Sequence, residues 1–221
     1  MKKTGFTLAE VLITLAIIGV VATMTLPALM TNTQEQQAKT GLKKGLNTLT
    51  EAAQMNLATD GFDYAGITAA SNAVSSAEGQ QSMTGLLVAR TQVDYQASNN
   101  GGGTSDAGNV DATATNYVVF FRDGSSVSFP NAAPAATTKV LQADGLPLGF
   151  GVIYDYNGAK RPNLMSNCAG NTAMSGANKT DAANKGACTK ANRVIRDQFS
   201  VRLRGGFAYP NGAAANWAYE N

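Results

Sequence analysis

The chain has 221 residues, of which 14% are charged, and it contains no histidine. Without histidine, a histidine general base, a Ser-His-Asp triad and a histidine-containing metal site are excluded. The formal net charge is +2, so overall charge gives no support to general nucleic-acid binding. The length fits one membrane anchor with one compact domain.

A membrane-length apolar segment lies at the N-terminus. It runs from Phe6 to Leu29 behind Lys2 and Lys3. As a helix rising about 1.5 Å per residue, it is long enough to cross a hydrocarbon core of about 30 Å. Basic residues before the segment favour a cytoplasmic N-terminus and an exported C-terminal part. Glu10 is the one charged side chain inside it, at a cost of roughly 2.5–3.5 kcal/mol, so we expect Glu10 to have a partner or a function.

Two ordinary interpretations compete at this point. A secretory signal peptide would be cleaved after the apolar region, and Ala22-Thr23-Met24 fits the small-x-small cleavage pattern loosely. An uncleaved membrane anchor is the other interpretation. Neither explains Glu10 or the amphipathic pattern that follows the apolar segment.

The helical pattern continues beyond the apolar segment. Five apolar residues recur three or four positions apart and so share one helix face: Ala38, Leu42, Leu46, Leu49 and Ala53. Polar residues between them form the opposite face: Gln36, Lys39, Lys43, Lys44 and Glu51. We therefore expect one helix from about Phe6 to about Leu57 that stops at Asp60-Gly61. Pro27 should kink or loosen this helix, and Gly19 is a second weak point.

The N-terminal residues resemble the signature of type IV pilins and type II secretion pseudopilins. The match is Lys2-Lys3-Thr4-Gly5 followed by Phe6-Thr7-Leu8-Ala9-Glu10-Val11-Leu12-Ile13, with Pro27 downstream. In that family a prepilin peptidase cuts after the glycine and methylates the new N-terminal phenylalanine. The resemblance therefore implies cleavage between Gly5 and Phe6, N-methylation of Phe6, and Glu10 as the fifth residue of the mature chain.

The resemblance also implies a mode of assembly. In a low-dielectric filament core the Glu10 carboxylate needs a cation, and the amino group of Phe6 on a neighbouring subunit supplies it. Other implied partners are related pilins or pseudopilins, the prepilin peptidase, a platform protein and an assembly ATPase at the inner membrane. Pro27 and Gly19 would let the helix extend in the filament. Loss of the leader lysines leaves 15 basic against 15 acidic side chains, which makes nucleic acid an unexpected partner.

The only two cysteines, Cys168 and Cys188, predict a disulfide. They are too few for a zinc site without histidine, and a cysteine pair in an exported domain usually forms a disulfide. The loop between them is rich in Ala, Asn, Gly and Lys, so it could not pack by itself. Closing it would stabilise the fold by roughly 3 kcal/mol on the chain-entropy model. Two free thiols are the alternative.

Strand signals are concentrated in the second half of the exported part. Residues 61–115 are poorly patterned, and Gly85–Tyr95 fits either a short helix or a strand. Strands are expected at Tyr117–Arg122, Ser126–Phe129, Phe150–Asp155 and Gln198–Arg204, with an Asp123-Gly124 turn between the first two. An antiparallel sheet with one apolar face needs a covering helix, which the apolar stripe of the long helix supplies.

These elements predict an α+β, pilin-like fold. A long N-terminal α-helix, transmembrane in its first half, packs on a small antiparallel β-sheet, and a disulfide closes a C-terminal loop. The expected segments are a leader peptide (1–5), a transmembrane and filament-core helix (6–30), an amphipathic helix (31–60) and a globular pilin-like domain (61–221).

One group of oxygen-bearing residues could carry chemistry. Asp155-Tyr156-Asn157-Gly158 is followed by Arg161-Pro162-Asn163 and, after the cysteine loop, by Asp197-Gln198-Phe199, similar to a C-terminal pattern of pilin-like proteins. One interpretation is a structural turn capped by Asp and Asn side chains. The other is a calcium site using Asp155, Asn157 and Asp197, because some pseudopilins bind calcium near the C-terminus and the spacing is half of a calcium loop. No other cofactor is expected.

Two further groups of side chains remain open to interpretation. Four aromatic residues near the C-terminus either pack on the sheet edge or form an exposed patch: Phe207, Tyr209, Trp217 and Tyr219. Five basic residues form either a solvated face or a phosphate contact: Lys190, Arg193, Arg196, Arg202 and Arg204.

The sequence thus predicts a non-enzymatic structural subunit of a type II secretion or type IV pilus-like filament. It would be a single-pass inner-membrane protein with a cytoplasmic N-terminus and a periplasmic domain, and after assembly part of a periplasmic or extracellular filament. A DNA-uptake or adhesion minor pilin on the same scaffold is the alternative. An exported enzyme is disfavoured, because the sequence has no histidine and no nucleophile motif.

Overall fold

A computed structural model describes residues 5–64, 82–99, 116–130, 149–160, 163–168, 188–189 and 191–221. The chain divides into two compact units, Met1–Gln37 and Ala38–Asn221. Some predictions fall outside the described residues: those for Met1–Thr4 of the leader, for Arg161 and Pro162, and for Lys190.

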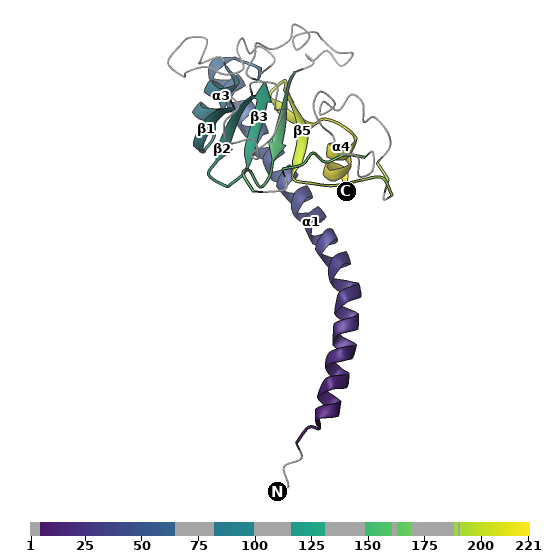
Figure 1. Cartoon of the computed structure of the whole chain (residues 1–221). Coiled ribbons are helices and arrows are strands. Elements are labelled where there is room, and N and C mark those ends of the chain that lie inside the picture. Colours follow the sequence, from purple (N-terminus) through teal and green to yellow (C-terminus); the bar gives the residue numbers. More distant parts are fainter. Residues whose placement is uncertain are drawn as a thin grey trace. The chain divides into compact units, whose positions relative to one another are not determined.

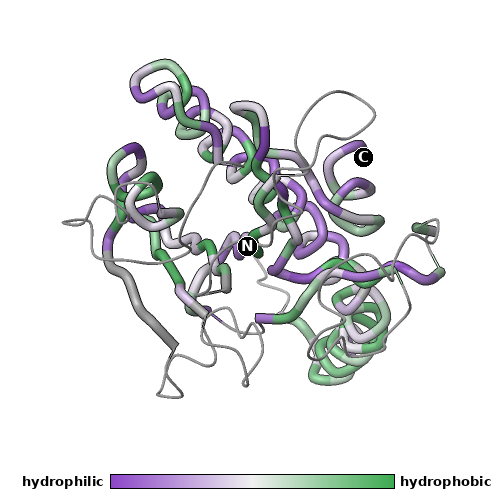
Figure 2. Tube along the Cα trace, turned by 90° about the horizontal axis from the view of Figure 1, so that it is seen from above, coloured by the Kyte–Doolittle hydropathy of each residue, from purple (hydrophilic) through white to green (hydrophobic). Residues whose placement is uncertain are grey.

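Helix α1 runs from Leu8 to Asp60, as the periodic pattern predicted, and it is continuous through Pro27. It ends at Gly61, whose φ of +63° lies in the left-handed region that glycine adopts without a Cβ penalty. Threonine hydroxyls along its apolar half donate to carbonyls one turn earlier, for example Thr23 to Val20 at 2.8 Å. In a bilayer, where a hydroxyl has no water to bind, such bonds would satisfy the threonine side chains. In Figure 2 this apolar segment is the predominantly green coil.

The segment that fitted either a helix or a strand contains one of each. Helix α3 spans Met83–Arg90 and is capped by Ser82, whose Oγ accepts the Gly85 amide at 3.0 Å. Strand β1, Val93–Asn99, follows after two intervening residues. The local sequence could not separate the two because both elements are short.

The remaining strands form an antiparallel meander with β1 (Figure 1). They are β2 (Asn116–Phe121), β3 (Ser126–Pro130), β4 (Phe150–Asp155), β5 (Gln198–Arg204) and β6 (Phe207–Pro210). The order in the sheet is β1-β2-β3-β4-β5-β6, and every pair is antiparallel. The four predicted strands are thus confirmed, and the sequence missed β6 and the final helix α4, Ala213–Glu220.

The β2–β3 turn has the predicted Asp-Gly chemistry. Gly124 has a φ of +87°, and its amide donates to the Phe121 carbonyl at 3.0 Å. The Asp123 carboxylate accepts the Ser125 amide at 2.9 Å and also pairs with Lys44 of α1 at 2.8 Å. This turn therefore both reverses the chain and fastens the hairpin to the helix.

The core lies between the second half of α1 and one face of the sheet. All five residues of the predicted apolar stripe are buried there: Ala38, Leu42, Leu46, Leu49 and Ala53. They pack in one cluster with strand residues, among them Val119, Val127, Phe129, Val152, Phe199, Val201 and Leu203. Full burial of one such side chain contributes roughly 1.5–3 kcal/mol, so this contact is the main stabilising feature of the second unit.

Two glycines let the sheet approach α1 closely. A Cβ at Gly41 would lie 2.5 Å from the Tyr156 Cβ, and a Cβ at Gly45 would overlap the Tyr154 ring. Both tyrosines come from β4 or from the residue directly after it. Gly41 and Gly45 are one helical turn apart, so together they form a flat surface on which these side chains lie.

One prediction about α1 is wrong. Lys39 was placed on the polar face, but it is only 8% exposed. Its Nζ lies 4.1 Å from the centre of the Trp217 ring of α4. The prediction failed because the sequence analysis did not foresee α4. This helix covers Lys39, which the sequence pattern assigned to the solvent-facing side of α1.

Candidate functional site

The first candidate site is the chain immediately before α1. Gly5, Phe6 and Thr7 are non-helical, and the Phe6 side chain is 91% exposed. A Cβ added at Gly5 would meet no atom within 4 Å. The Gly5–Phe6 peptide bond therefore lies in exposed, non-helical chain, the kind of segment that proteases cut.

Glu10 closes the start of α1 through Thr7. The Glu10 Oε2 accepts the Thr7 amide at 2.9 Å and the Thr7 hydroxyl at 2.8 Å, and the Glu10 amide donates to the Thr7 Oγ1 at 3.3 Å. This reciprocal pattern is a capping box with Thr7 at the N-cap. The carboxylate also lies at the positive end of the helix dipole. Reasoning from hydropathy and charge missed Thr7, although the spacing Thr-x-x-Glu identifies it.

The large apolar side chains after Glu10 are exposed. Between 46% and 63% of the surface is accessible at each of Val11, Leu12, Ile13, Leu15, Ile17, Ile18, Val20 and Val21. Among the described residues, α1 is the one helix long and apolar enough to cross a membrane. Such a continuous apolar surface requires lipid or protein around it.

The second candidate site is the turn after β4. The Asp155 Oδ1 accepts hydrogen bonds from the backbone amides of Asn157 and Gly158, each at 3.0 Å. Its Oδ2 accepts a hydrogen bond from the side-chain Nε2 of Gln198 at 3.1 Å. Gly158 has a φ of +64°, and a Cβ there would collide with the Gly124 carbonyl. Asp155 therefore shapes the turn, and only glycine fits at its end.

Asp197 connects another segment, at Asn163 and Leu164, to the same turn. Its Oδ2 accepts the Asn163 amide at 2.6 Å, and its Oδ1 accepts the Leu164 amide at 2.7 Å. The Asn157 Nδ2 donates to the Asp197 Oδ2 at 3.3 Å. The three residues predicted as a site are thus brought together, with Asn157 bonded to both carboxylates.

The environment of Asp155 favours its neutral form. Burial, reinforced by the nearby Asp197 charge, raises the pKa of Asp155 to about 7, against the opposing effect of its hydrogen bonds. At neutral pH a substantial fraction of Asp155 therefore carries a proton.

The oxygen atoms around Asp155 and Asp197 have features of both a structural turn and a calcium site. Every carboxylate oxygen of Asp155 and Asp197 accepts a protein N–H, as in a structural turn. The buried side-chain oxygens of Asn157 and Asn163 accept no hydrogen bond in the described structure, and amide oxygens are calcium ligands. No group of three or more His, Cys, Asp or Glu residues that could hold a metal occurs within the described ranges. A cation here would depend on the two asparagines.

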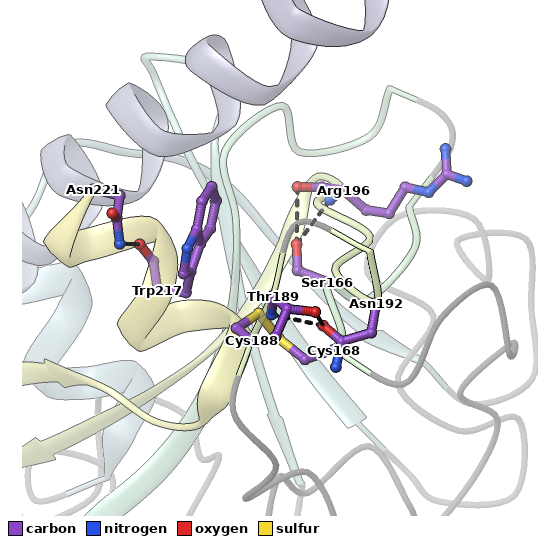
Figure 3. The surroundings of a disulfide bond; sticks show 8 residues. All are labelled: Ser166, Cys168, Cys188, Thr189, Asn192, Arg196, Trp217 and Asn221. Atoms are coloured by element: carbon purple, nitrogen blue, oxygen red, sulfur yellow. Dashed lines mark hydrogen bonds between the residues drawn. A yellow bond between two sulfur atoms is a disulfide. The ribbon is translucent and has the colours of Figure 1, made fainter.

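Cys168 and Cys188 form the predicted disulfide, with their Cα atoms 5.2 Å apart (Figure 3). A second connection lies beside it. Asn167 and Val194 form an antiparallel bridge, with N–H···O distances of 2.9 and 2.8 Å. Ser166 adds two bonds to the backbone of Arg196, at 2.8 and 3.1 Å. Hydrogen bonds and the disulfide therefore together fix the two ends of the loop.

The basic and aromatic residues divide into two groups. Arg202 pairs with Tyr209 and Arg204 with Phe207 across β5 and β6. The Arg204 guanidinium lies 5.1 Å from the Tyr209 ring centre. Trp217 belongs to a separate group, since it packs against the core and contacts Lys39 and Arg193.

Comparison with known proteins gives a match at the N-terminus. Residues 1–26 match the prokaryotic N-terminal methylation motif. The N-terminus is a type IV prepilin signature. No curated protein and no solved structure matches the chain.

The prepilin signature includes Gly5, Phe6, Thr7 and Glu10, the residues of the first candidate site. Together with the long α1 helix and the antiparallel sheet, it supports a type IV pilin-like or pseudopilin-like subunit. The signature and the exposed apolar helix also indicate membrane anchoring. The family is one of structural subunits rather than enzymes.

Proposed function

We propose that the protein is a structural subunit of a type II secretion or type IV pilus-like filament. Prepilin peptidase cleaves it after Gly5 and methylates Phe6, and the subunit polymerises through α1. The observation that carries the proposal is the prepilin signature directly before an exposed, membrane-length apolar helix.

Before assembly the subunit resides in the inner membrane, with its N-terminus in the cytoplasm and its C-terminal domain in the periplasm. The basic residues before Phe6 support this orientation. An assembly ATPase and a platform protein then move subunits from lipid into the filament. The apolar side chains exchange lipid contacts for contacts with other copies, so little hydrophobic free energy is lost in the transfer.

In the filament, the Glu10 carboxylate pairs with the Phe6 amino group of a neighbouring copy. An isolated carboxylate in a low-dielectric bundle is costly, and this amine is the cation that cleavage creates. Both Thr7 donors end on one oxygen, Oε2, so the pairing does not require the capping box to break.

The test is filament incorporation of Glu10→Ala in cells that assemble the wild-type chain. Glu51→Ala is the matched control, because it is the same substitution at an exposed carboxylate of the same helix. Thr7→Val removes the capping hydroxyl and keeps the carboxylate. We expect Glu10→Ala to insert in the membrane but to be absent from sheared filaments, while both other variants assemble. Normal filaments from Glu10→Ala would refute the proposal.

A binding pilin on the same scaffold is the second candidate. The observation that favours it is the block of Arg202, Arg204, Phe207 and Tyr209 on β5 and β6, since guanidinium and aromatic groups together contact phosphates and bases. Salt-dependent binding of DNA to the full chain, lost in Phe207→Ala, would support this role. Absence of binding at low salt would remove it.

We also propose calcium binding at Asp155, Asn157 and Asp197. Its support is the proximity of the two carboxylates to the buried Asn157 and Asn163 oxygens. Isothermal titration of the full chain with calcium should give heat that is absent in Asp197→Asn. No heat at millimolar calcium would leave the structural turn as the role of these residues.

A further inference from the structure

The single tryptophan of the chain lies between two cations from distant parts of the sequence. The Trp217 ring centre is 4.1 Å from the Lys39 Nζ of α1 and 4.1 Å from the Arg193 guanidinium carbon. Trp217 is also in the last turn of α4, where its carbonyl accepts the Asn221 backbone and side-chain amides (Figure 3). Contacts of this kind contribute most when the cation is desolvated, which describes the buried Lys39.

Helix α4 needs tertiary contacts to be stable. It has eight residues, and its N-cap is Gly212, which gives no side-chain capping bond. Helices this short are unstable alone, so tertiary contacts must hold α4 in place. Its fully buried residues are alanines: Ala214, Ala215 and Ala218. Trp217 is therefore the largest side chain by which α4 packs on the rest of the unit.

Arg193 is positioned by a short turn that starts beside the disulfide. The Asn192 Oδ1 accepts the Thr189 amide at 2.7 Å and the Thr189 hydroxyl at 2.9 Å. The Arg193 amide donates to the Thr189 carbonyl at 3.1 Å. Thr189 directly follows Cys188, so the disulfide fixes the first residue of this turn (Figure 3).

On its other side, Arg193 is followed by the bridge between Val194 and Asn167. Asn167 directly precedes Cys168, so the disulfide and the bridge join the same two segments. Breaking the disulfide leaves the turn held at one end only. Arg193 then gains conformational freedom that opposes its contact with Trp217.

We propose that the Cys168–Cys188 disulfide controls the docking of α4 on α1, through Arg193 and the Trp217 ring. Reduction by a dithiol adds two electrons and two protons to give two thiols, and the dithiol becomes the cyclic disulfide. The hydrogen bonds of the Asn167–Val194 bridge persist, the Arg193 contact weakens, and α4 opens more often. The device is independent of the filament role proposed above.

The experiment compares amide hydrogen exchange of α4 in the full chain in detergent, oxidised and after reduction by dithiothreitol with alkylation. Arg193→Ala removes the contact, and Arg196→Ala is the matched control. We expect reduction to speed exchange in residues 213–220 about tenfold, the effect of losing one half-buried cation–π contact. Oxidised Arg193→Ala should reproduce this change, and Arg196→Ala should not.

Combining reduction with Arg193→Ala distinguishes an effect that acts through Arg193 from a general loss of stability. If the disulfide acts through Arg193, reduction of Arg193→Ala adds little further exchange in α4. The proposal is overturned if α4 exchange in oxidised Arg193→Ala equals that of the wild type. It is also overturned if reduction speeds α4 exchange equally in the wild type and in Arg193→Ala. The oxidised comparison remains decisive even if reduction unfolds the whole unit, because Arg193→Ala keeps the disulfide. Acrylamide quenching of Trp217 should follow the same pattern.

Discussion

At the scale of single residues, Asp155 is a carboxyl group whose hydrogen bonds favour its charged form while its burial favours the neutral form. Asp155 as a whole is 1% exposed. Its carboxyl group lies near Asp197 and accepts three N–H bonds. Burial outweighs these bonds and raises the pKa of Asp155 to about 7. The position therefore links the stability of the second unit to pH.

The sign of this linkage follows from the raised pKa. Below about pH 4, Asp155 is protonated in both the folded and unfolded chain, and its contribution to stability is fully present. As pH rises from about 4 to 7, the unfolded chain loses this proton more readily than the folded one, so the free energy of unfolding falls, by roughly 2–4 kcal/mol. Asp155→Asn keeps the acceptor and should flatten this fall.

Chemical denaturation of the full chain in detergent with EDTA, at pH 4 to 8, measures the effect. Asp94→Asn, at an exposed carboxylate on β1, is the control. If wild type and Asp155→Asn show the same pH slope, then Asp155 does not carry the linkage.

At the scale of elements, the contact between α1 and β4 depends on two positions without side chains. In an exposed helix interior, Gly→Ala normally stabilises by about 1 kcal/mol. At Gly45 the added methyl group would overlap the Tyr154 ring, which is buried in the core. The higher helix propensity of alanine would stabilise the fold, and the overlap with Tyr154 would destabilise it. Gly45→Ala therefore shows which of the two effects is larger.

We expect Gly45→Ala to lower the free energy of unfolding by about 1–3 kcal/mol, because the ring cannot move within a close-packed core. Gly151→Ala is the matched control, since a Cβ on that exposed glycine of β4 would meet nothing within 4 Å. Denaturant midpoints at constant m-value measure both. A stabilised Gly45→Ala would show that α1 and β4 are further apart than described.

The sequence was sufficient for elements with long or regular patterns. Helix α1 was predictable because its apolar stripe recurs over several turns. Strand β4 was predictable because it is largely apolar, and β5 because apolar and polar residues alternate along it. Strand β6 has four residues and α4 has eight, so neither carries enough periodicity to be recognised. Their placement depends on tertiary contacts, such as the bond from the Ala208 amide to the Thr50 hydroxyl.

The candidate sites followed the same division. Gly5, Phe6 and Glu10 lie within the motif matched at residues 1–26, and their roles stay predictions. Thr7 was missed as a cap, although its Thr-x-x-Glu spacing to Glu10 is that of a capping box. Asp155, Asn157 and Asp197 lie together in the structure, although Asp197 is far from the others in sequence, and their role as a site stays a prediction. The burial of Lys39 was unpredictable, since it requires α4 to be placed first.

At the scale of the whole molecule, the chain joins two units with opposite demands on their surroundings. The unit Met1–Gln37 exposes apolar side chains along α1, while Ala38–Asn221 buries its apolar residues against a sheet. The boundary falls within the predicted amphipathic segment 31–60, and the division into four functional segments stays a prediction. In the filament role proposed above, such a division would let the apolar helix leave the membrane while the second unit stays folded.

The central claim is that the chain is a prepilin, and processing of its N-terminus tests it most directly. The full chain should be expressed with a prepilin peptidase, and the intact mass and N-terminal peptide of the purified protein measured. We predict a mature chain that begins at N-methylated Phe6, and retention of Met1–Gly5 when the peptidase is omitted. A mature chain that begins near Thr25, as a signal peptidase would produce, would contradict the account.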